Sequence, residues 1–459
     1  MSGQWVDDLL LAGPDDQACL RLGDQLDLAA LREAVGQAEL ELRAAGLSVH
    51  GTAAIYLPPS LSYVVTVLAV WRIGAQAQVI DHRLTEHELD RALTRLRPQL
   101  IIRPVTRAGG ALRGFQVVTA RIDLRPDGVP SATAHAMVQL SSGSTGPSKV
   151  IGRTVGELVD EVHRYAQVDG MPVRGERLVV LSSMAHAYGL MGGLLHSLHS
   201  GVEIVLPERA TVDGIRRVIA ESQARTTVMG VPFHFELLAS VADPEPLPQL
   251  VAAVSAGDRL RPDVAEAFRA RYGVRVGEIY GMTEMGLIAA DMSGANRPAT
   301  GWPAPGIEVR VENGELLVAR PVTPYLGEAD PTRWVDGWLR TKDAATIDDE
   351  TGLITVLGRL DSQVAVGGMK VDLTEVEQTI VALDEVAIAV VTFTGSIEVY
   401  LELAGDAELS TVETKLTERL AVFKRPKRFH LMSTLPRTAT GKPVRDVSVL
   451  REAAAVAIP

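Results

Sequence analysis

The run from Ser141 to Lys149, which reads SSGSTGPSK, combines the residue types that a phosphate-binding loop needs. Glycine lets backbone N–H groups approach phosphate oxygens closely, hydroxyl groups add neutral donors, and a lysine adds a mobile cation for a negative leaving group. The spacing differs from the common P-loop, in which four residues separate the glycines and Ser or Thr follows the lysine. Here two residues separate the glycines, and valine follows Lys149. By itself the run indicates either a nucleotide loop or a polar surface turn.

Five further segments of the chain match one known order of motifs. They are MAHAYGL at 184–190, IYGMTEMG at 279–286, DGWLRTKD at 336–343, GRLDSQVAVGGMKVDLTEVE at 358–377 and LPRTATGKPVR at 435–445. With the loop, these segments make the chain resemble, almost end to end, the adenylate-forming superfamily of acyl-CoA synthetases, adenylation domains and luciferases. One such match could arise by chance, whereas six in the right order could hardly do so.

The resemblance implies a reaction that converts a carboxylic acid and ATP into an acyl-AMP and pyrophosphate. Charge develops on phosphate oxygens, so the protein acts mainly by positioning and electrostatic stabilisation. The match implies that Tyr280 stacks on adenine, that Thr283 contacts phosphate, and that Glu284 binds Mg²⁺, which prefers oxygen ligands. It also implies that Asp343 binds the ribose hydroxyls and that Arg359 makes a second ribose or phosphate contact. Without the match, a solvated carboxylate or a surface ion pair would explain each charged residue.

The predicted site residues fall into three groups by role. The catalytic group is Lys442, His186, Thr283 and Glu284. The nucleotide and thiol group is Ser142, Gly143, Ser144, Thr145, Gly146, Lys149, Gly257, Asp258, Tyr280, Gly281, Asp343, Arg359, Gly367 and Gly368. The Mg²⁺ ligands are Glu284 and Thr145. Within this set, Gly257 of SAGDRL would let adenine or a flat substrate lie against the backbone, since glycine has no side chain.

Two of these residues carry distinct roles by resemblance. Lys442 lies in RTATGKPVR and would swing onto the α-phosphate and the substrate carboxylate as the new bond forms. His186 would gate the channel between the carboxylate pocket and a thiol tunnel, and the alternative is a hydrogen-bonded packing residue. Amino-acid-activating relatives carry an Asp near His186, but Ala185, Ala187 and Tyr188 supply none. An α-amino acid substrate is therefore disfavoured, and an aryl or small acyl acid is preferred.

The acceptor of the acyl group stays open at this stage. The segment VGGMKVD at 366–372 matches the one that admits a phosphopantetheine arm, which both CoA and an acyl carrier protein bear. Four basic residues could serve either acceptor or form a solvated surface; they are Lys424, Arg425, Lys427 and Arg428. Attack by an amine would instead give an amide. A catalytically silent acyl-nucleotide binding protein is a further alternative, and a kinase is disfavoured because no kinase motif is present.

Four positions depart from the superfamily pattern, and they suggest a specialised, biosynthetic branch. Pro147 arrives one place early, so that Ser148 takes the usual position of the proline. Val150 replaces the last glycine of the loop, and Lys342 replaces the glycine that usually precedes the ribose-binding Asp. These changes leave reduced or altered activity open, because they alter the loop around Lys149 and add a cation near the nucleotide.

Composition agrees with a multidomain ligase of small molecules. The chain has 459 residues, of which 46% are hydrophobic, so more than one domain is expected. Its net charge of −12 argues against nucleic acid or an anionic membrane as a partner. Its single cysteine, Cys19, excludes an intrachain disulfide, and no secretory signal or membrane span is recognised. We therefore expect a cytoplasmic protein, either a monomer or a homodimer.

The pattern of apolar runs predicts an α/β fold. Strand-like runs alternate with helix-like runs, as at 53–57, 61–73, 76–80 and 86–96, which is typical of sheets covered by helices. Polar stretches at 121–132 and 291–306 are predicted loops. We predict an N-terminal adenylation domain of layered subdomains at 1–360 and a small α+β domain at 361–459. Within the small domain we predict strands at 386–393 and 397–403 and a helix at 409–422. By the resemblance, the small domain is a mobile lid that presents different faces in two half-reactions.

Overall fold

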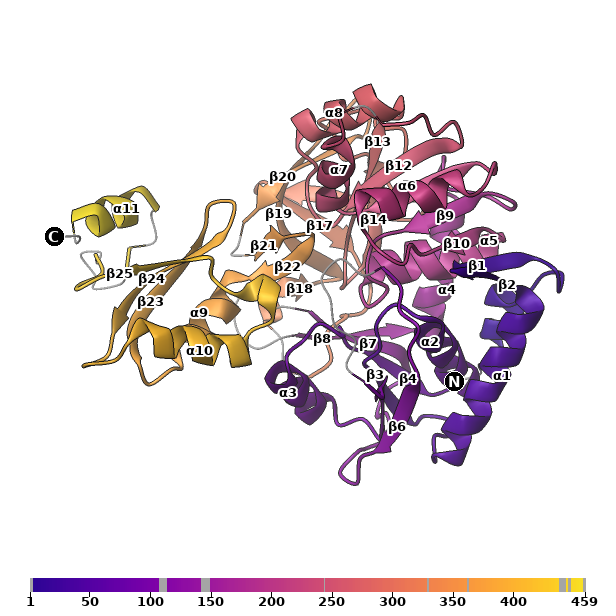
Figure 1. Ribbon diagram of the computed structural model, residues 1–459, viewed down its shortest axis with the longest axis horizontal. Helices are drawn as coiled ribbons and strands as arrows, with labels where there is room; N and C mark the ends of the chain where they lie inside the picture. The colour runs from indigo at the N-terminus through magenta and orange to yellow at the C-terminus, as the bar shows by residue number, and fades with distance from the viewer. Residues whose placement is uncertain are drawn as a thin grey trace. The chain divides into compact units, whose positions relative to one another are not determined.

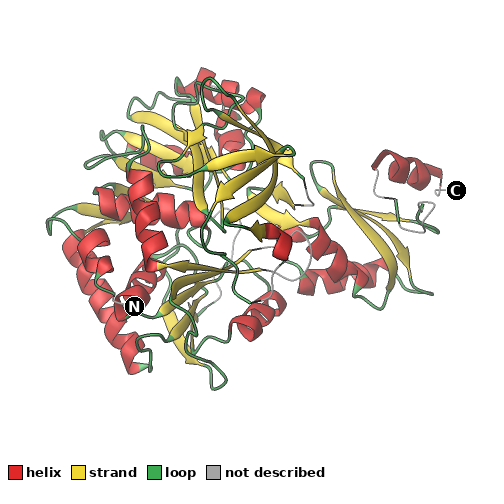
Figure 2. Ribbon diagram, turned by 180° about the vertical axis from the view of Figure 1, so that it is seen from behind, coloured by secondary structure: helices red, strands yellow, loops and turns green. Residues whose placement is uncertain are grey.

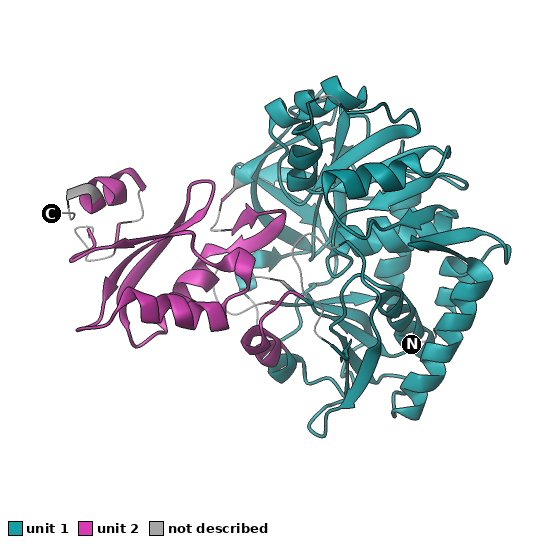
Figure 3. Cartoon of the chain, in the orientation of Figure 1, with its two compact units in different colours: residues 1–82, 93–140, 150–358 teal, residues 83–92, 141–149, 359–459 magenta. Residues whose placement is uncertain are grey.

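The computed structural model describes residues 3–106, 114–141, 149–242, 244–327, 330–360, 363–436, 443–444 and 447–456. The described chain divides into two compact units (Figure 3). Unit 1 comprises residues 1–82, 93–140 and 150–358, and unit 2 comprises residues 83–92, 141–149 and 359–459. The long C-terminal part of unit 2 thus begins at Arg359, close to the boundary expected from the sequence. That 1–360 and 361–459 act as separate domains stays a prediction.

One sheet of unit 1 has the strand order β15-β14-β13-β12-β11-β9-β10-β1-β2 (Figure 1). Its strands are β1 (Ala18–Leu22), β2 (Asp24–Asp27), β9 (Arg177–Val180), β10 (Glu203–Val205), β11 (Thr226–Gly230), β12 (Leu250–Ala256), β13 (Val276–Met282), β14 (Gly286–Asp291) and β15 (Trp302–Pro303). The central neighbours β10, β9, β11, β12 and β13 all pair in parallel. Their carboxyl ends therefore lie along one edge of the sheet, where ligands of such folds bind.

The two faces of this sheet enter different apolar cores. Leu178 and Val180 of β9 face one core, and Val179 between them faces the other, as the alternation of a strand requires. Helices α6 (Val212–Ala220), α7 (Pro232–Ala239) and α8 (Pro262–Tyr272) supply the second core, where the rings of Phe235 and Phe268 lie 5.4 Å apart. The first core contains side chains of α4 (Val155–Ala166), η2 (Tyr188–Leu195) and α5 (His196–Ser200). Figure 2 shows helices, in red, lying against the strands, in yellow.

A second sheet has the strand order β6-β5-β3-β4-β7-β8. Its strands are β3 (Thr52–Ile55), β4 (Gln76–Val79), β5 (Leu100–Pro104), β6 (Ala120–Leu124), β7 (His135–Ser141) and β8 (Lys149–Thr154), and η1 (Val6–Leu10), α1 (Leu28–Ala44), α2 (Leu61–Ile73) and α3 (Glu86–Leu96) accompany them. The predicted helices 61–73 and 86–96 are confirmed. Helix α2 is buried nearly all round and begins where the Ser60 side chain accepts a hydrogen bond from the N–H of Tyr63. No helix in the described ranges is long and apolar enough to cross a bilayer.

The prediction of a loop over residues 121–132 is wrong at its start, because β6 covers Arg121 to Leu124. This strand pairs antiparallel with β5 at the end of the sheet order. Its Asp123 lies 2.5 Å from Arg103 of β5. An edge strand with polar residues on both faces lacks the apolar alternation that marks a buried strand. The predicted loop 291–306 similarly contains the short strand β15.

A third sheet of unit 1 carries the end of the DGWLRTKD motif. It contains β16 (Val309–Glu312), β17 (Glu315–Ala319), β18 (Trp334–Val335), β19 (Trp338–Ile347) and β20 (Ile354–Arg359), with the short helix η3 (Pro331–Arg333) before β18. The pairing of β17 with β19 shifts register between Glu315 and Leu317. At this irregularity Lys342 adopts a φ of +61°. The position thus requires the left-handed backbone that glycine tolerates best.

Unit 2 is a small α+β arrangement. Its strands are β21 (Gln363–Val366), β22 (Met369–Asp372), β23 (Val386–Phe393), β24 (Ile397–Leu403) and β25 (Arg428–Leu431), and its helices are α9 (Leu373–Val381), α10 (Leu409–Arg419), η4 (Val422–Lys424) and α11 (Val447–Val456). The strands predicted at 386–393 and 397–403 are confirmed residue for residue. Helix α10 ends at Arg419, earlier than the predicted end at 422. Unit 2 has its own apolar core between α9, α10 and the sheet β23-β24-β25, and this core contains Val376, Val399 and Leu416.

A buried network of charges joins α4 to β14. Arg153, the penultimate residue of β8, pairs with Glu161 of α4, and both side chains are almost wholly buried. The Oε1 atom of Glu161 also accepts a hydrogen bond of 3.0 Å from the N–H of Leu287. Glu161 therefore fixes the start of β14, directly after the IYGMTEMG motif. A second pair, Glu157 with Arg320, lies beside it.

We predict that Arg153→Met destabilises the protein by about 3–5 kcal/mol, because it leaves the Glu161 carboxylate buried without its counter-charge. Adding Glu161→Gln should restore part of this loss, since the amide oxygen can still accept from Leu287. Urea unfolding of the single and double variants measures both effects. A double variant no more stable than Arg153→Met would contradict the prediction.

We predict that Lys342→Gly raises the stability. Glycine relieves a left-handed strain of about 1–2 kcal/mol, and its greater freedom in the unfolded chain offsets about 0.5–1 kcal/mol of this gain. Lys342→Ala is the matched control, because it removes the ammonium group but keeps the strained backbone. The urea midpoint of the glycine variant should exceed that of the alanine variant, and the reverse order would refute this explanation.

Candidate active site

The motif residues of unit 1 lie where parallel strands end. Residues 183–187 follow β9, Gly257 and Asp258 follow β12, and the turn with Thr283 and Glu284 follows β13. The register pairs Ser255 with Glu278 across β12 and β13, so the two strands end side by side. Gly257 has a φ of +88°, which a side chain would disfavour. Asp258 is exposed, and its carboxylate accepts a hydrogen bond of 2.7 Å from the N–H of Arg259.

Tyr280 and Asp343 are brought together although 63 positions separate them in the sequence. The hydroxyl of Tyr280 donates to Oδ2 of Asp343 at 2.5 Å. The N–H of Asp343 donates to the Thr341 hydroxyl at 3.0 Å, and this hydroxyl donates to the carbonyl of Leu316 at 2.8 Å. Asp343 is thereby held on the third sheet facing the end of β13. The residues expected to contact adenine and ribose thus form one hydrogen-bonded pair.

Gly281 allows the turn that follows β13 to close tightly. The pairing of β13 with β14 shifts register between Tyr280 and Gly281. A Cβ atom at Gly281 would lie 2.4 Å from the carbonyl oxygen of Gly286, which no side chain could tolerate. The turn carries Thr283, which is partly buried, and Glu284, which is 5% exposed. Glycine at this position therefore shapes the turn that presents the predicted phosphate and metal contacts.

Tyr325 lies beside both Glu284 and the buried Arg333 of η3. Burial, and then the negative charge of Glu284, raise the pKa of Tyr325, whereas Arg333 acts in the opposite direction. Glu284 is thus buried beside Tyr325, unlike the solvated loop carboxylate considered as an alternative. No group of three or more His, Cys, Asp or Glu suited to a metal occurs among the described residues. A single carboxylate still fits Mg²⁺, which proteins often hold with one or two carboxylates plus substrate phosphates.

His186 lies next to an acid that the motifs do not include. Its Nε2 atom lies 3.1 Å from Oδ2 of Asp81, which follows β4. The hydroxyl of Tyr63 donates to the carbonyl of Met184 at 2.5 Å. Burial, and then the charge of Asp81, raise the pKa of Tyr63, so the carboxylate also lies near this anchor. Asp81 is not among the site residues predicted from the sequence. Its place directly after the apolar strand β4 was a usable signal for a site residue.

Several predicted site residues fall outside what the structure describes. Residues 142–148, which include Ser142, Gly143, Ser144, Thr145 and Gly146, and residues 437–442, which include Lys442, lie outside the described residues. The same holds for the side chain of Arg359. Lys149 is described as the buried first residue of β8. The roles assigned to all these residues stay predictions.

Gly367 and Gly368 form the two-residue turn of the hairpin β21–β22 in unit 2. The pairing of Val366 with Met369 closes the hairpin, and the two glycines have φ values of +56° and +78°. Two consecutive positive φ values are typical of a type I′ turn, which glycine favours. The turn itself thus explains why glycines occur here. Contact with a phosphopantetheine arm stays a prediction.

Two of the four clustered basic residues of unit 2 form ion pairs with carboxylates of the same unit. The Nζ atom of Lys424 lies 3.0 Å from Glu88 and 3.2 Å from Glu375. Burial lowers the pKa of Lys424, but the two carboxylates outweigh burial and raise it. Arg428 lies 3.1 Å from the buried Glu398. A solvated basic surface is therefore wrong for Lys424, and its charge is neutralised within the unit.

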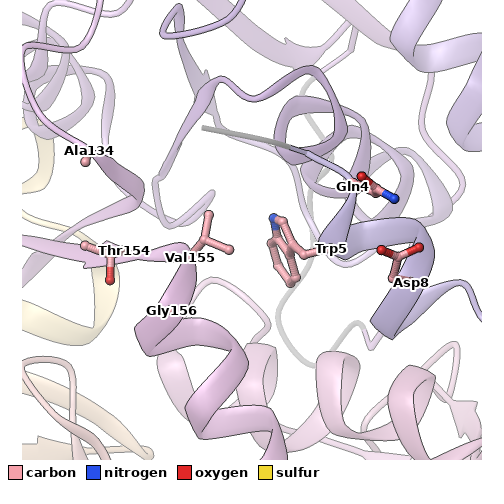
Figure 4. Close-up of a pocket in the computed structure, with 7 residues that line it drawn as sticks. All are labelled: Gln4, Trp5, Asp8, Ala134, Thr154, Val155 and Gly156. Carbon is pink, nitrogen blue, oxygen red and sulfur yellow. The ribbon is translucent and has the colours of Figure 1, made fainter.

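A cavity of about 550 Å³ opens elsewhere on unit 1 (Figure 4). Its lining combines the N-terminal turn with the start of α4, and the residues are Gln4, Trp5, Asp8, Ala134, Thr154, Val155 and Gly156. The Trp5 ring points toward Val155. None of the motif residues described above belongs to this lining. The cavity therefore carries no part of the predicted chemistry.

Glu278 is the most perturbed acid beside the motif on β13. Burial raises its pKa from 4.5 to about 7, although Arg297 at 3.1 Å opposes this effect. A raised folded-state pKa means that the native protein binds this proton more tightly than the unfolded chain does. The resulting stability is fully present below pH 4.5 and is lost as the pH rises through about 7.

We predict that Glu278→Gln removes this pH dependence. Between about pH 5 and pH 8 the variant should gain about 2–3 kcal/mol relative to the wild type, since the amide cannot ionise. Urea unfolding at several pH values measures the difference between the two proteins. A difference that does not change with pH would show that the Glu278 proton does not titrate in this range.

Comparison with known proteins agrees with this geometry. The family model described as AMP-binding enzyme matches residues 11–328. The chain is 26% identical to the p-hydroxybenzoic acid–AMP ligase FadD22 of Mycobacterium tuberculosis over 88% of this chain, and it spans 62% of that relative's length. It is also 26% identical to 4-chlorobenzoate–CoA ligase of an Arthrobacter species, over 83% of this chain and 82% of the relative.

A solved structure shares the fold along nearly the whole chain. It is a double mutant of o-succinylbenzoate CoA synthetase (MenE) from Bacillus subtilis with a bound product analogue, and the TM-score is 0.82 at 23% identity. The match covers 96% of this chain and 97% of that one. The prediction of an α/β fold with a small C-terminal part is confirmed by this likeness. The chain is a member of the AMP-binding enzyme family, within the adenylate-forming superfamily.

Proposed function

We propose that this protein activates a carboxylic acid as an acyl-AMP with ATP and then passes the acyl group to a phosphopantetheine thiol. The observation that supports this most is the Tyr280–Asp343 pair at the carboxyl edge of β13, with Glu284 on the next turn. An aromatic ring, a ribose-binding carboxylate and a carboxylate for a metal are what AMP recognition and phosphate chemistry need at one place. Family membership supports the same conclusion.

In this proposal the protein acts by holding its reactants. Tyr280 stacks on adenine, and Asp343 accepts hydrogen bonds from the ribose hydroxyls. Lys149 and the loop before it bind the phosphates, and Lys442 neutralises charge as the carboxylate attacks the α-phosphate. Glu284 and Thr145 would hold Mg²⁺, which when bound neutralises charge on the phosphate oxygens. Thr283 adds a neutral donor beside them.

An aryl or small acyl acid is the proposed substrate class. The two relatives compared above are named for p-hydroxybenzoic acid and 4-chlorobenzoate, both aryl acids. Ala185, Ala187 and Tyr188 supply no acid beside His186, but Asp81, which follows β4, contacts His186. Because this carboxylate already contacts His186, an α-amino acid substrate stays disfavoured. Amino acids are nevertheless included in the test below.

CoA is the preferred acceptor, and an acyl carrier protein or an amine remains a competing one. The relative named 4-chlorobenzoate–CoA ligase supports CoA. The neutralised charge of Lys424 removes one basic residue that either CoA or a carrier helix could have used. The cytoplasmic location and the monomeric or homodimeric state stay predictions. A silent nucleotide-binding protein would bind ATP without any acid-dependent reaction.

The test is exchange of labelled pyrophosphate into ATP across a panel of aryl, fatty and amino acids. We expect strong exchange with an aryl or small acyl acid. Asp343→Ala should lower it about 10- to 100-fold, since it removes a charged hydrogen-bond acceptor for ribose. Asp348→Ala is the matched control, because Asp348 lies in an exposed turn and contacts Thr351.

Lys442→Ala belongs in the same experiment and should also lose exchange. ATP binding without exchange by any acid would refute acid activation and favour a silent binding protein. Exchange with amino acids alone would refute the substrate class but not the reaction. Product analysis with CoA, carrier protein and amine then identifies the acceptor.

A further inference from the structure

Asp81 and His186 form a pair in which one member is sheltered and the other is accessible. Oδ2 of Asp81 lies 3.1 Å from Nε2 of His186, and Oδ1 lies 3.7 Å from Nδ1 of His82. The side chain of Asp81 is 11% exposed, whereas that of His186 is 55% exposed. The carboxylate is thus largely buried, and the imidazole is the member of the pair that a ligand could reach.

The backbone around His186 is already fixed by other elements. Tyr63 and Gln139 donate to the two carbonyls that precede it in the chain, at 2.5 and 2.7 Å. The carbonyl of His186 accepts a hydrogen bond of 3.0 Å from the N–H of Leu190. The backbone of this residue is therefore held in place by its neighbours. The contact with Asp81 adds a constraint on the orientation of the imidazole.

Topology explains why these residues meet. Strands β4 and β7 are parallel neighbours, so Asp81, just after β4, lies at the same edge as the carboxyl end of β7. Gln139 is on β7 and holds residue 185, which follows β9 of the other sheet. The pair thus forms where the first and second sheets of unit 1 are joined. His186 belongs to the MAHAYGL motif, whereas Asp81 lies outside all the motif segments.

The contact also selects one tautomer of His186. A carboxylate accepts a hydrogen bond but donates none, so Nε2 carries the hydrogen in the neutral ring and Nδ1 carries the lone pair. If Nδ1 then takes up a proton, the same carboxylate stabilises the resulting imidazolium, as in other carboxylate–histidine pairs. Asparagine at position 81 could accept the hydrogen bond but would supply no charge.

We propose that Asp81 is a positioning residue for acyl transfer, holding His186 so that Nδ1 meets the acceptor thiol. In this step the thiol sulfur bonds to the acyl carbon, the bond from that carbon to the AMP oxygen breaks, and AMP leaves with the electron pair. The thiol proton passes to Nδ1 of His186. The inference rests on the proposed function, because only a thiol-using ligase has this step.

The two half-reactions separate this role from a structural one. Asp81→Asn should leave pyrophosphate exchange within about twofold of the wild type, because adenylation precedes the step. Single-turnover transfer from preformed acyl-AMP to CoA should fall about 10- to 100-fold, as when an orienting partner is lost. His186→Ala should show the same split, and the double variant should fall no further than His186→Ala.

Asp123→Asn is the matched control, because it also removes one carboxylate from an ion pair, with Arg103 on the edge strands β5 and β6. It should change neither half-reaction. The ¹⁵N shifts of His186 give a readout without turnover: the wild type should show protonated Nε2, and Asp81→Asn should show mixed tautomers. This measurement also applies if a variant is too unstable for kinetics at the assay temperature.

Three results would overturn the inference. These are equal losses in both half-reactions, unchanged transfer in Asp81→Asn, or losses that add in the double variant. Each leaves the proposed function intact, because the wild type would still make thioester. A wild type that forms acyl-AMP but no thioester with CoA or a carrier protein would instead refute the thiol step, and the inference would fall with it.

Discussion

The parallel pairing of β9, β11, β12 and β13 is the constraint on which the rest of the site depends. Parallel strands deliver every following loop to one edge of the sheet, so segments far apart in sequence become neighbours. This pairing places at one edge of the sheet residues 183–187, Gly257 and the turn at 283–285. Without that pairing, Tyr280 could not meet Asp343, which arrives from a different sheet.

Buried polar contacts then fix the loops that the sheet brings together. Glu161 holds the start of β14, Thr341 holds Asp343, and Tyr63 holds the segment before His186. Each contact satisfies a group that would otherwise be costly to bury, so each fixes one arrangement of the backbone. The positions of the reactive side chains therefore depend on residues outside the motifs. Asp81 contacts the motif residue His186, and Glu161 holds the backbone directly after the IYGMTEMG motif.

The fold was largely predictable because its elements have strong local signals. The helix at 61–73 and the strands at 386–393 and 397–403 are apolar, regular and bounded by turn residues, and all three agree with the structure. β6 was not predictable, because its polar residues lie at an edge. The motifs predicted that Tyr280 and Asp343 belong to one site. They could not predict the Asp81–His186 contact, because it depends on how two sheets meet, and no local pattern encodes that.

The central claim is that a carboxylate oxygen of the substrate bonds to the α-phosphorus of ATP. We would test it with an acid labelled by ¹⁸O in both carboxylate oxygens, one turnover in the presence of ATP and the thiol, and mass spectrometry of the nucleotide. The account predicts that AMP carries one ¹⁸O atom, because the acyl–oxygen bond breaks when the thiol attacks. Unlabelled AMP, or ADP with the label in inorganic phosphate, would contradict it.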